Sequence, residues 1–298
     1  MDDTVSTFSG ARTLLYVPGH RRDQFAKARD SGADAIVLDL EDAVGPDAKA
    51  VARRNVADWL AEEGCGAVRI NGLGSPWHEE DIAMLAGYSR IVILPKAESG
   101  SRAIQLRHRL PAVAGIVPIL ETAAGILAAW DVCSARGVIR AIFGSADLAG
   151  QLGFDHRNRL ALGHARCQVV LASAASGLAP PLDGASTAIS DMPTLATEAA
   201  HAAKLGFSGK SCIHPRQIPV VRAAFAPSAQ EVEWARKVIA ATGNGSATAL
   251  DGQFIGKPVV VRAHRLLQRH SETGRPGTGT RADGTARAGN VAVPLDQS

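Results

Sequence analysis

Two acidic residues close two apolar, strand-like segments near the middle of the chain. Glu121 ends GIVPILE, Asp147 ends IRAIFGSAD, and the helix-length stretch AAGILAAWDVCSARG lies between them. This order predicts a strand–helix–strand unit whose two strands are parallel, with both carboxylates at the same edge. Mg²⁺ takes one or two protein carboxylates together with substrate oxygens, so the pair predicts a magnesium site. In the alternative interpretation, one carboxylate caps the following helix and the other is solvated.

The remainder of the chain repeats this alternation of strand and helix. The other strand-like segments are TLLYVPG, AIVLDLEDAV, AVRING, RIVILPKAES, a weak APPLDGAS, and GKSCIHP. Eight strands alternating with helices within residues 1–225 predict an α/β fold, a (β/α)8 TIM barrel. A doubly wound open sheet is the competing fold. Its first turn would carry a glycine-rich dinucleotide pattern, which VPGHRRDQ lacks.

Beyond the barrel, residues 226–270 are predicted to form a C-terminal helical lid. Residues 228–241 have amphipathic spacing, and the hinge ATGNGSATA then leads through LDGQFIGKP to a last helix at 259–269. That helix has an uneven apolar face that is expected to need a partner surface, made of Val260, Val261, Ala263, His264 and Leu267. Residues 271–298 have few apolar side chains, which predicts a disordered tail.

Composition limits the class of protein. The chain is 46% hydrophobic with only 4% aromatic residues, which favours a core of small aliphatic side chains under a helix-covered parallel sheet. The net charge of +3 and the lack of a dense basic run argue against nucleic acid as a partner. No apolar run is long enough to span a membrane, and the start has no secretory pattern. Cys65, Cys133, Cys167 and Cys212 form no CxxC pair, so a cytoplasmic protein is expected.

The barrel interpretation gathers polar and charged side chains at the carboxyl ends of the strands. Carboxylates alone would attract only cations, but nearby arginine and lysine side chains would also allow an anionic ligand to bind. The predicted substrate is therefore a small acid bearing a carboxylate or a phosphate. His214 is more typical of a strand-end hydrogen-bonding residue than of a base. The predicted rim consists of Arg12, Asp39, Glu41, Asp42, Arg69, Asn71, Lys96, Glu98, Glu121, Asp147, Asp183 and His214.

Seven phrases of the sequence carry a family resemblance. They are RTLLYVPG, LDLEDAV, VRING, ILPKAES, ILETAAG, FGSADLA and GKSCIHPRQI, in order and with compatible spacing. Together they resemble the CoA-ester lyases of the citrate lyase beta-subunit family, in the HpcH/HpaI aldolase superfamily, which includes malyl-, citramalyl- and citryl-CoA lyases. The resemblance extends over about residues 12–269. It implies that Glu121 and Asp147 hold Mg²⁺, that Arg69 binds the substrate carboxylate, and that Asp39, Glu41 and Asp42 are supporting acids.

The activity implied by this resemblance is Mg²⁺-dependent retro-aldol cleavage of a 3-hydroxyacyl-CoA. The products are a 2-oxo acid and acetyl-CoA or another short acyl-CoA. The general base stays open among Asp39, Glu41 and Asp42, while Arg12 and Lys96 are candidates for binding the CoA phosphates. Two other functions also stay open: an aldolase acting on free hydroxy-oxo acids, and a non-catalytic or partner-dependent subunit of a lyase complex.

The C-terminal segment is where the sequence departs from the family pattern. The family often forms trimers in which this segment closes over a neighbour's site, so a homotrimer is expected. Many relatives carry an acid just before the proline of the segment matching LDGQFIGKP. Gly256 stands at that position here, while Asp251 is retained upstream. If the acid exchanges a proton with the thioester enolate, this chain has lost it or uses another group.

The tail can be tested by truncation. Removal of residues 271–298 is expected to leave the melting temperature and the activity nearly unchanged, because the segment has too little apolar surface to pack. Thermal unfolding of the full and truncated chains measures this directly. A fall of several degrees on truncation would show that the tail packs against the folded part.

Overall fold

The computed structural model describes residues 3–242, 248–250 and 253–273. Eight strands in these residues close into a barrel, each parallel to its neighbours in chain order, and β8 pairs with β1. The prediction of a TIM barrel is therefore confirmed. The strands are β1 (Thr13–Pro18), β2 (Ala35–Asp39), β3 (Ala67–Arg69), β4 (Ile91–Leu94), β5 (Gly115–Leu120), β6 (Ile142–Phe143), β7 (Leu182–Asp183) and β8 (Gly209–Cys212).

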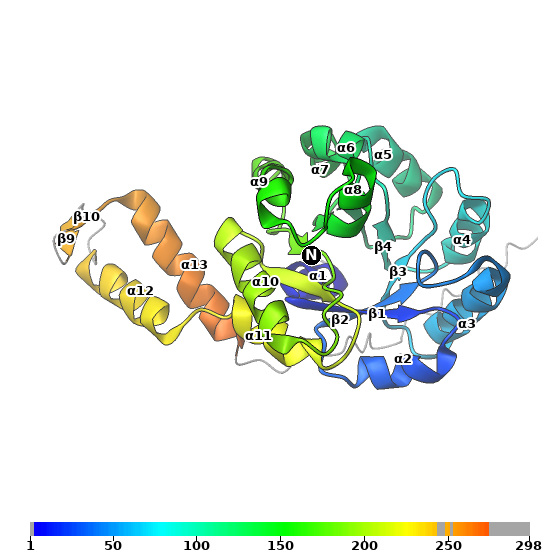
Figure 1. The fold of residues 1–298 in the computed structure, drawn as a ribbon, viewed down its shortest axis with the longest axis horizontal. Helices are drawn as coiled ribbons and strands as arrows, with labels where there is room; N and C mark the ends of the chain where they lie inside the picture. The colour runs from blue at the N-terminus through cyan, green and yellow to red at the C-terminus, as the bar shows by residue number, and fades with distance from the viewer. Residues whose placement is uncertain (1–2, 243–247, 251–252, 274–298) are drawn as a thin grey trace, which may run out of the picture.

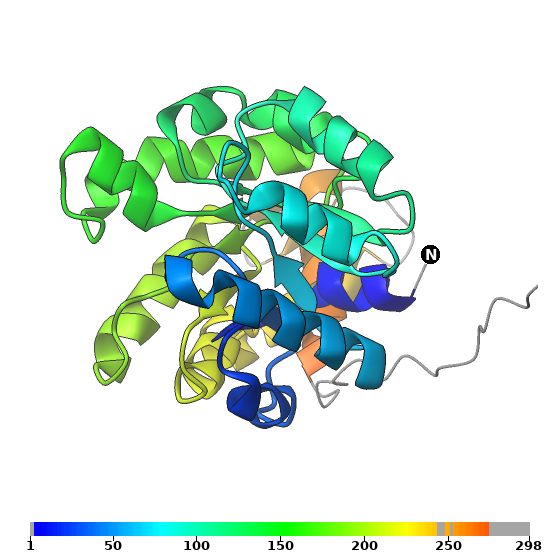
Figure 2. The same ribbon diagram turned by 90° about the vertical axis from the view of Figure 1, so that its right-hand side faces the viewer.

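Helices surround the barrel on its outer side (Figure 1, Figure 2). Where the sequence predicted one helix between β5 and β6, two short helices occur. The first is capped by Thr122, whose hydroxyl accepts a hydrogen bond from the Gly125 N–H. The outer helices are α2 (Arg22–Arg29), η1 (Pro46–Ala48), α3 (Lys49–Glu62), α4 (His78–Leu85), α5 (Gly100–Arg109), α6 (Ala123–Leu127), α7 (Ala129–Ser134), α8 (Ser145–Leu152), α9 (Arg159–Ala175), α10 (Met192–Leu205) and α11 (Gln217–Phe225).

The core has two layers because side chains alternate across each strand. The larger layer lies between the strands and the outer helices. The smaller layer fills the barrel interior with mainly aliphatic side chains, namely Leu14, Val37, Ala67, Ile91, Ile93, Val117, Ile119, Ile142 and Leu182. A barrel filled in this way holds the strand ends rigidly, which fixes the loops that follow them.

An N-terminal helix, α1 (Asp3–Gly10), packs against the interior layer through Phe8. The buried Arg140 guanidinium donates to the Phe8 and Ala11 carbonyls, at 2.8 and 2.7 Å. These contacts lie beside the start of β1, so α1 covers the N-terminal end of the barrel. The sequence had not indicated this helix, because eight residues with one large apolar side chain have no clear helical period.

The last described helices form an arm that extends away from the barrel (Figure 1). Helix α12 (Ala229–Ala241) begins with a capping box between Ser228 and Glu231, as its sequence allows. A hairpin of β9 (Thr248–Leu250) and β10 (Gln253–Ile255) joins it to α13 (Lys257–Thr273).

The arm corrects two expectations about the last helix. Of the face that was expected to need a partner, Ala263 is buried against α12 and Val260 and Leu267 are half-buried there, so the same chain covers part of that face, while His264 stays exposed. Val261 is 49% exposed. Helix α13 continues through residues 271–273, so a truncation that spares it begins at residue 274. Most of the predicted hinge and the rest of the predicted tail lie outside the described residues.

In the part of the chain that the structure describes, no helix has the length and apolarity needed to cross a bilayer. Three of the cysteines are buried, and all four are free thiols.

Candidate active site

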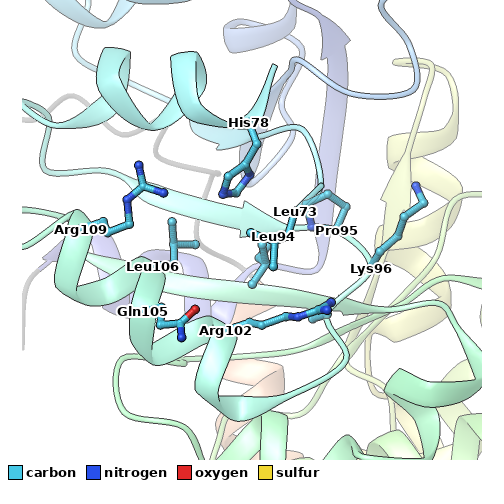
Figure 3. Close-up of a pocket in the computed structure, with 10 residues that line it drawn as sticks. Leu73, His78, Leu94, Pro95, Lys96, Arg102, Gln105, Leu106 and Arg109 are labelled. Carbon is cyan, nitrogen blue, oxygen red and sulfur yellow. The ribbon is translucent and has the colours of Figure 1, made fainter. Parts of the chain in front are cut away.

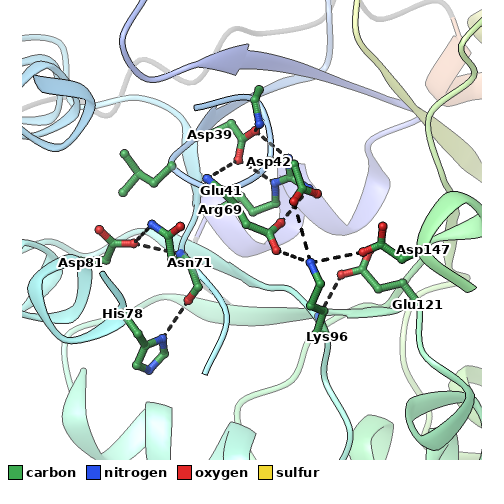
Figure 4. A network of polar contacts seen from close by, with 12 residues as sticks. Asp39, Glu41, Asp42, Arg69, Asn71, His78, Asp81, Lys96, Glu121 and Asp147 are labelled. Atoms are coloured by element: carbon green, nitrogen blue, oxygen red, sulfur yellow. Dashed lines mark hydrogen bonds and ion pairs between the residues drawn. The ribbon is translucent and has the colours of Figure 1, made fainter. Parts of the chain in front are cut away.

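Five acidic and two basic side chains gather at the carboxyl-terminal end of the barrel (Figure 4). They come from the carboxyl ends of β2, β3, β4 and β5 and from α8, the helix that follows β6. Asp147 lies in the first turn of α8, beyond β6, and so belongs to a helix and not to the strand that the sequence suggested. The set is Asp39, Glu41 and Asp42 after β2, Arg69 at the end of β3, Lys96 after β4, Glu121 after β5, and Asp147 in α8.

Arg69 forms a bidentate salt bridge with Asp39. Its Nε and NH2 atoms each lie 2.6 Å from a different oxygen of that carboxylate. Asp39 is fully buried and also accepts hydrogen bonds from the backbone N–H groups of Glu41 and Ala43. Burial lowers the pKa of Arg69, but the hydrogen bonds and charge of Asp39 outweigh it and raise that pKa well above its usual value. Arg69 is thus a fixed positive charge, whose NH1 lies 3.0 Å from Glu41 Oε2.

Lys96 reaches three acids at once. Its backbone N–H donates to Glu121 Oε1 at 2.9 Å, while its Nζ lies 2.6 Å from Glu41 Oε1 and 3.2 Å from Asp147 Oδ2. Among the described residues it is the one non-glycine with a positive φ, at 50°. Such a left-handed backbone costs about 1–3 kcal/mol and persists where the surroundings enforce it. The conformation turns both donors of Lys96 toward the carboxylates.

Glu121 is buried beside other acids. Burial raises the pKa of Glu121 to about 8, and the negative charges of Glu41 and Asp147 act in the same direction. Glu41 Oε2 and Asp147 Oδ2 are buried oxygens with no hydrogen-bond donor among the described residues, although each lies in an ion pair. Five carboxylates face only two cations here, so the cluster favours one more positive charge.

These residues fit a divalent cation whose shell is completed from elsewhere. No group of three or more His, Cys, Asp or Glu side chains in the described ranges is arranged to hold a metal by itself. Mg²⁺ keeps several waters and commonly uses one or two carboxylates, so Glu121 and Asp147 suffice if water or substrate oxygens fill the other positions.

Two residues that the sequence analysis had not selected support the cluster. The buried Lys49 ammonium donates to the carbonyls of Leu40 and Glu41, at 2.6 and 2.8 Å, and fixes the loop that carries the acids. The ring of Tyr16 lies under Arg69, 5.1 Å from its guanidinium carbon. Strand alternation after Leu14 could have placed Tyr16 inside the barrel. No local pattern indicated Lys49.

Two predicted rim residues lie elsewhere. Arg12 directly precedes β1, so it is at the opposite, N-terminal end of the barrel, where it donates to the Arg269 carbonyl at 2.6 Å. The prediction that it binds substrate or CoA phosphates at the rim is therefore wrong. Asp183 follows the interior residue Leu182 and faces the outer helices, where it forms ion pairs with Lys210 and Arg166.

Three further rim residues have local roles. Asn71 is buried and bonds Asp81 and Lys49. Glu98 accepts from Thr122 and pairs with Arg102, outside the carboxylate cluster. The ring Nδ1 of His214 accepts from a neighbouring backbone N–H, as expected for a strand-end residue.

A separate pocket lies between α4 and α5, beside the end of β4 (Figure 3). Lys96 contributes to its lining, but its side chain points away from the other labelled residues. None of the acids of the cluster lines this pocket. Its lining residues are Leu73, His78, Leu94, Pro95, Lys96, Ala97, Arg102, Gln105, Leu106 and Arg109.

The fold and the rim define a parallel eight-stranded barrel with a carboxylate-rich site at the carboxyl ends of its strands. Residues 12–215 match the family described as HpcH/HpaI aldolase/citrate lyase, and the chain belongs to that family.

Individual relatives agree with this assignment. A citrate lyase subunit beta-like protein of Mycobacterium tuberculosis is 36% identical over 266 residues, which cover 87% of this chain and 95% of that protein. A (3S)-malyl-CoA thioesterase of Cereibacter sphaeroides is 33% identical over 270 residues, covering 87% and 94%. The crystal structure of protein CitE from M. tuberculosis with magnesium, acetoacetate and coenzyme A has a TM-score of 0.79 at 35% identity, covering 88% of this chain and 98% of that one.

Gly144 allows the close approach of Glu121. A Cβ atom built on Gly144 would lie 2.7 Å from Glu121 Oε2, so Gly144→Ala should displace that carboxylate and destabilise the fold by about 1–3 kcal/mol. Gly150→Ala in α8 is the matched control: a Cβ there meets nothing within 4 Å. It should be neutral or stabilise by roughly 0.5–1 kcal/mol. Urea unfolding of both variants measures the difference, and equal stabilities would contradict the contact.

Proposed function

We propose that this chain is a Mg²⁺-dependent carbon–carbon lyase that cleaves a 3-hydroxyacyl-CoA of the citryl-, malyl- or citramalyl-CoA type. The observation that carries the proposal is the carboxylate pair of the buried Glu121 and the half-buried Asp147, in the same rim cluster as the fixed cation Arg69. A cation at the pair and the Arg69 guanidinium could together hold one small carboxylate. The relatives add support, because the M. tuberculosis protein was crystallised with magnesium, acetoacetate and coenzyme A.

In the proposed reaction, a base removes the proton of the substrate hydroxyl. The bond between the carbinol carbon and the thioester α-carbon breaks, the carbinol carbon becomes the carbonyl of a 2-oxo acid, and the electron pair leaves as a thioester enolate. The enolate then takes a proton to give acetyl-CoA or a short acyl-CoA. Mg²⁺, when bound to Glu121 and Asp147, would polarise the hydroxyl and lower its pKa.

The chain's own residues would orient the acid and move the proton. Arg69 pairs with the substrate carboxylate and stabilises negative charge as the bond breaks. Asp39 is the least suitable base, because both of its oxygens already bind Arg69 and two backbone N–H groups. Glu41 and Asp42 are the remaining candidates, and burial raises the pKa of Glu41 toward the range of a working base.

The family also supports two alternative functions. An aldolase acting on free hydroxy-oxo acids would use the same acids and Arg69 without CoA. A partner-dependent subunit would bind the ligands but turn them over only with other chains. Turnover assays with the purified chain distinguish the three functions. A lyase cleaves CoA thioesters, an aldolase cleaves free hydroxy-oxo acids, and a partner-dependent subunit turns over neither by itself.

We further propose a homotrimer in which residues 226–270 form a lid over a neighbour's site. The arm contacts the N-terminal end of its own barrel through Arg269 and Arg12, opposite the rim. Its hairpin lies at the far end of the arm (Figure 1), and Phe254 there is 75% exposed. A lid over its own rim would need a different position of the arm, whereas a second copy could receive the hairpin.

The metal assignment can be tested by removing either carboxylate. Glu121→Ala and Asp147→Ala should each abolish Mg²⁺-dependent cleavage of the CoA ester while the protein stays folded, because both side chains lie at the rim and not in the interior layer. Asp155→Asn is the control, since Asp155 pairs with the exposed Arg157 outside the cluster. Lyase rates and circular dichroism give the result. Full turnover in both alanine variants would exclude these residues as metal ligands.

The lid can be tested at the position that lacks an acid. The Gly256 carbonyl accepts hydrogen bonds from the first turn of α13, so an aspartate there would also suit a helix N-cap. Only the exposed Phe254 ring would have to shift, as a Cβ would lie 3.1 Å from it. General acids typically contribute about 10²–10⁴-fold, so Gly256→Asp should raise CoA-ester turnover detectably.

Gly256→Ala is the matched control and should not raise the rate. The oligomeric mass is measured on the same samples. A monomeric mass would contradict a lid supplied by a neighbouring copy. An unchanged rate in a confirmed trimer would mean that another group already exchanges the proton, and Asp251 is the first to test.

A further inference from the structure

Lys96 stands out because its charge is shared among acids from different segments. Its ammonium contacts Glu41 Oε1 and Asp147 Oδ2 at 2.6 and 3.2 Å, and it lies 3.8 Å from Asp42 Oδ1 (Figure 4). Arg69, the other cation, forms its bidentate salt bridge with Asp39. Lys96 is therefore the charge that holds the β2 loop and α8 together.

This ammonium lies against one of the two proposed metal ligands, and the backbone of the same residue binds the other. Asp147, which we propose as a metal ligand, has the Lys96 ammonium beside its Oδ2 oxygen. The other proposed ligand, Glu121, accepts the backbone N–H of Lys96 through Oε1. A divalent cation bound to these carboxylates would lie well within the Debye length of about 8 Å from the ammonium, so salt would screen their repulsion only weakly.

We propose that Lys96 is a built-in counter-ion of the metal-free site, which competes with the divalent cation and withdraws from Asp147 when that cation binds. This inference rests on the proposed function, because it takes Glu121 and Asp147 as the metal ligands. Lys96 is a positioning residue in this account. It holds the acids together without metal, and it lowers the affinity of the site for the metal.

The Lys96 side chain is flexible enough to move its ammonium away from Asp147. Lysine carries its charge on four flexible methylene groups, and this side chain is 42% exposed, so a swing toward water is open to it. The backbone N–H, fixed by the left-handed conformation, would stay on Glu121 while the ammonium moves. The released ammonium is then available to an anionic group of the substrate, which agrees with its predicted role in substrate binding.

The test measures Mg²⁺ binding to the full chain without substrate. Metal-free wild-type protein and Lys96→Met are titrated with MgCl₂ by calorimetry. Loss of the competing charge should tighten binding at least about tenfold, since a nearby charge pair in a partly buried site easily exceeds one factor of ten. Lys96→Arg, which keeps the charge, should bind like wild type. Arg102→Met removes a cation from α5 that pairs with Glu98, and it should change nothing.

A second readout is thermal unfolding. Without metal, Lys96→Met should melt at a lower temperature than wild type, because the acids lose their counter-ion. Addition of Mg²⁺ should raise the melting temperature of Lys96→Met by more than that of wild type, because a ligand stabilises the native state according to its affinity. Lys96→Gln replaces Lys96→Met if the latter is not folded by circular dichroism, with the same expected gain.

The outcomes separate this inference from the proposed function. Equal or weaker Mg²⁺ binding by the charge-removing variant, with binding still abolished by Asp147→Asn, would overturn the counter-ion role and leave the metal site intact. Binding that Asp147→Asn and Glu121→Gln do not affect, or no binding by any variant, would overturn both the metal assignment and this inference. Tighter binding that disappears when Asp147→Asn is added supports the competition.

Discussion

The parallel closure of the barrel is the constraint on which the site depends. Because β8 pairs with β1 in the same direction as every other neighbouring pair, the carboxyl ends of all eight strands form one ring. The interior is filled by aliphatic side chains, so the ring cannot contract or widen freely. Loops that are far apart in the chain are thereby held within reach of one another, and their side chains need only be of the right type.

Closure also concentrates negative charge, and burial makes the resulting repulsion strong. The cluster is balanced by charges that the chain itself supplies: Arg69 locked onto Asp39, and Lys96 between Glu41 and Asp147. The balance is incomplete, as the raised pKa of Glu121, a result of burial and of its acidic neighbours, indicates. The charge balance of the rim therefore favours one more cation, and the M. tuberculosis relative was crystallised with magnesium, acetoacetate and coenzyme A.

Much of the fold and the centre of the site could be predicted from local patterns. Apolar runs alternating with helical segments are sufficient for a parallel barrel, even where a strand such as β7 has only two residues. Arg69 and Glu121 sit at or directly after the end of a strand, so their positions on the ring follow from the strand itself. The capping box of helix α12 could also be predicted from local sequence, because Ser228 and Glu231 are three residues apart.

Partners and orientations depended on the assembled structure. Arg12 was assigned to the rim although it precedes β1, and the direction of the parallel strands puts it at the other end. Asp183 ends a strand as expected, but the alternation set by Leu182 turns it outward to Lys210. The Lys49 ammonium donates at 2.6 Å to the side chain of Asn71, which lies 22 residues later in the chain and follows the neighbouring strand β3. Such contacts exist only once the barrel has closed, because the distance between two side chains is set by strand register and packing, which no short stretch of residues encodes.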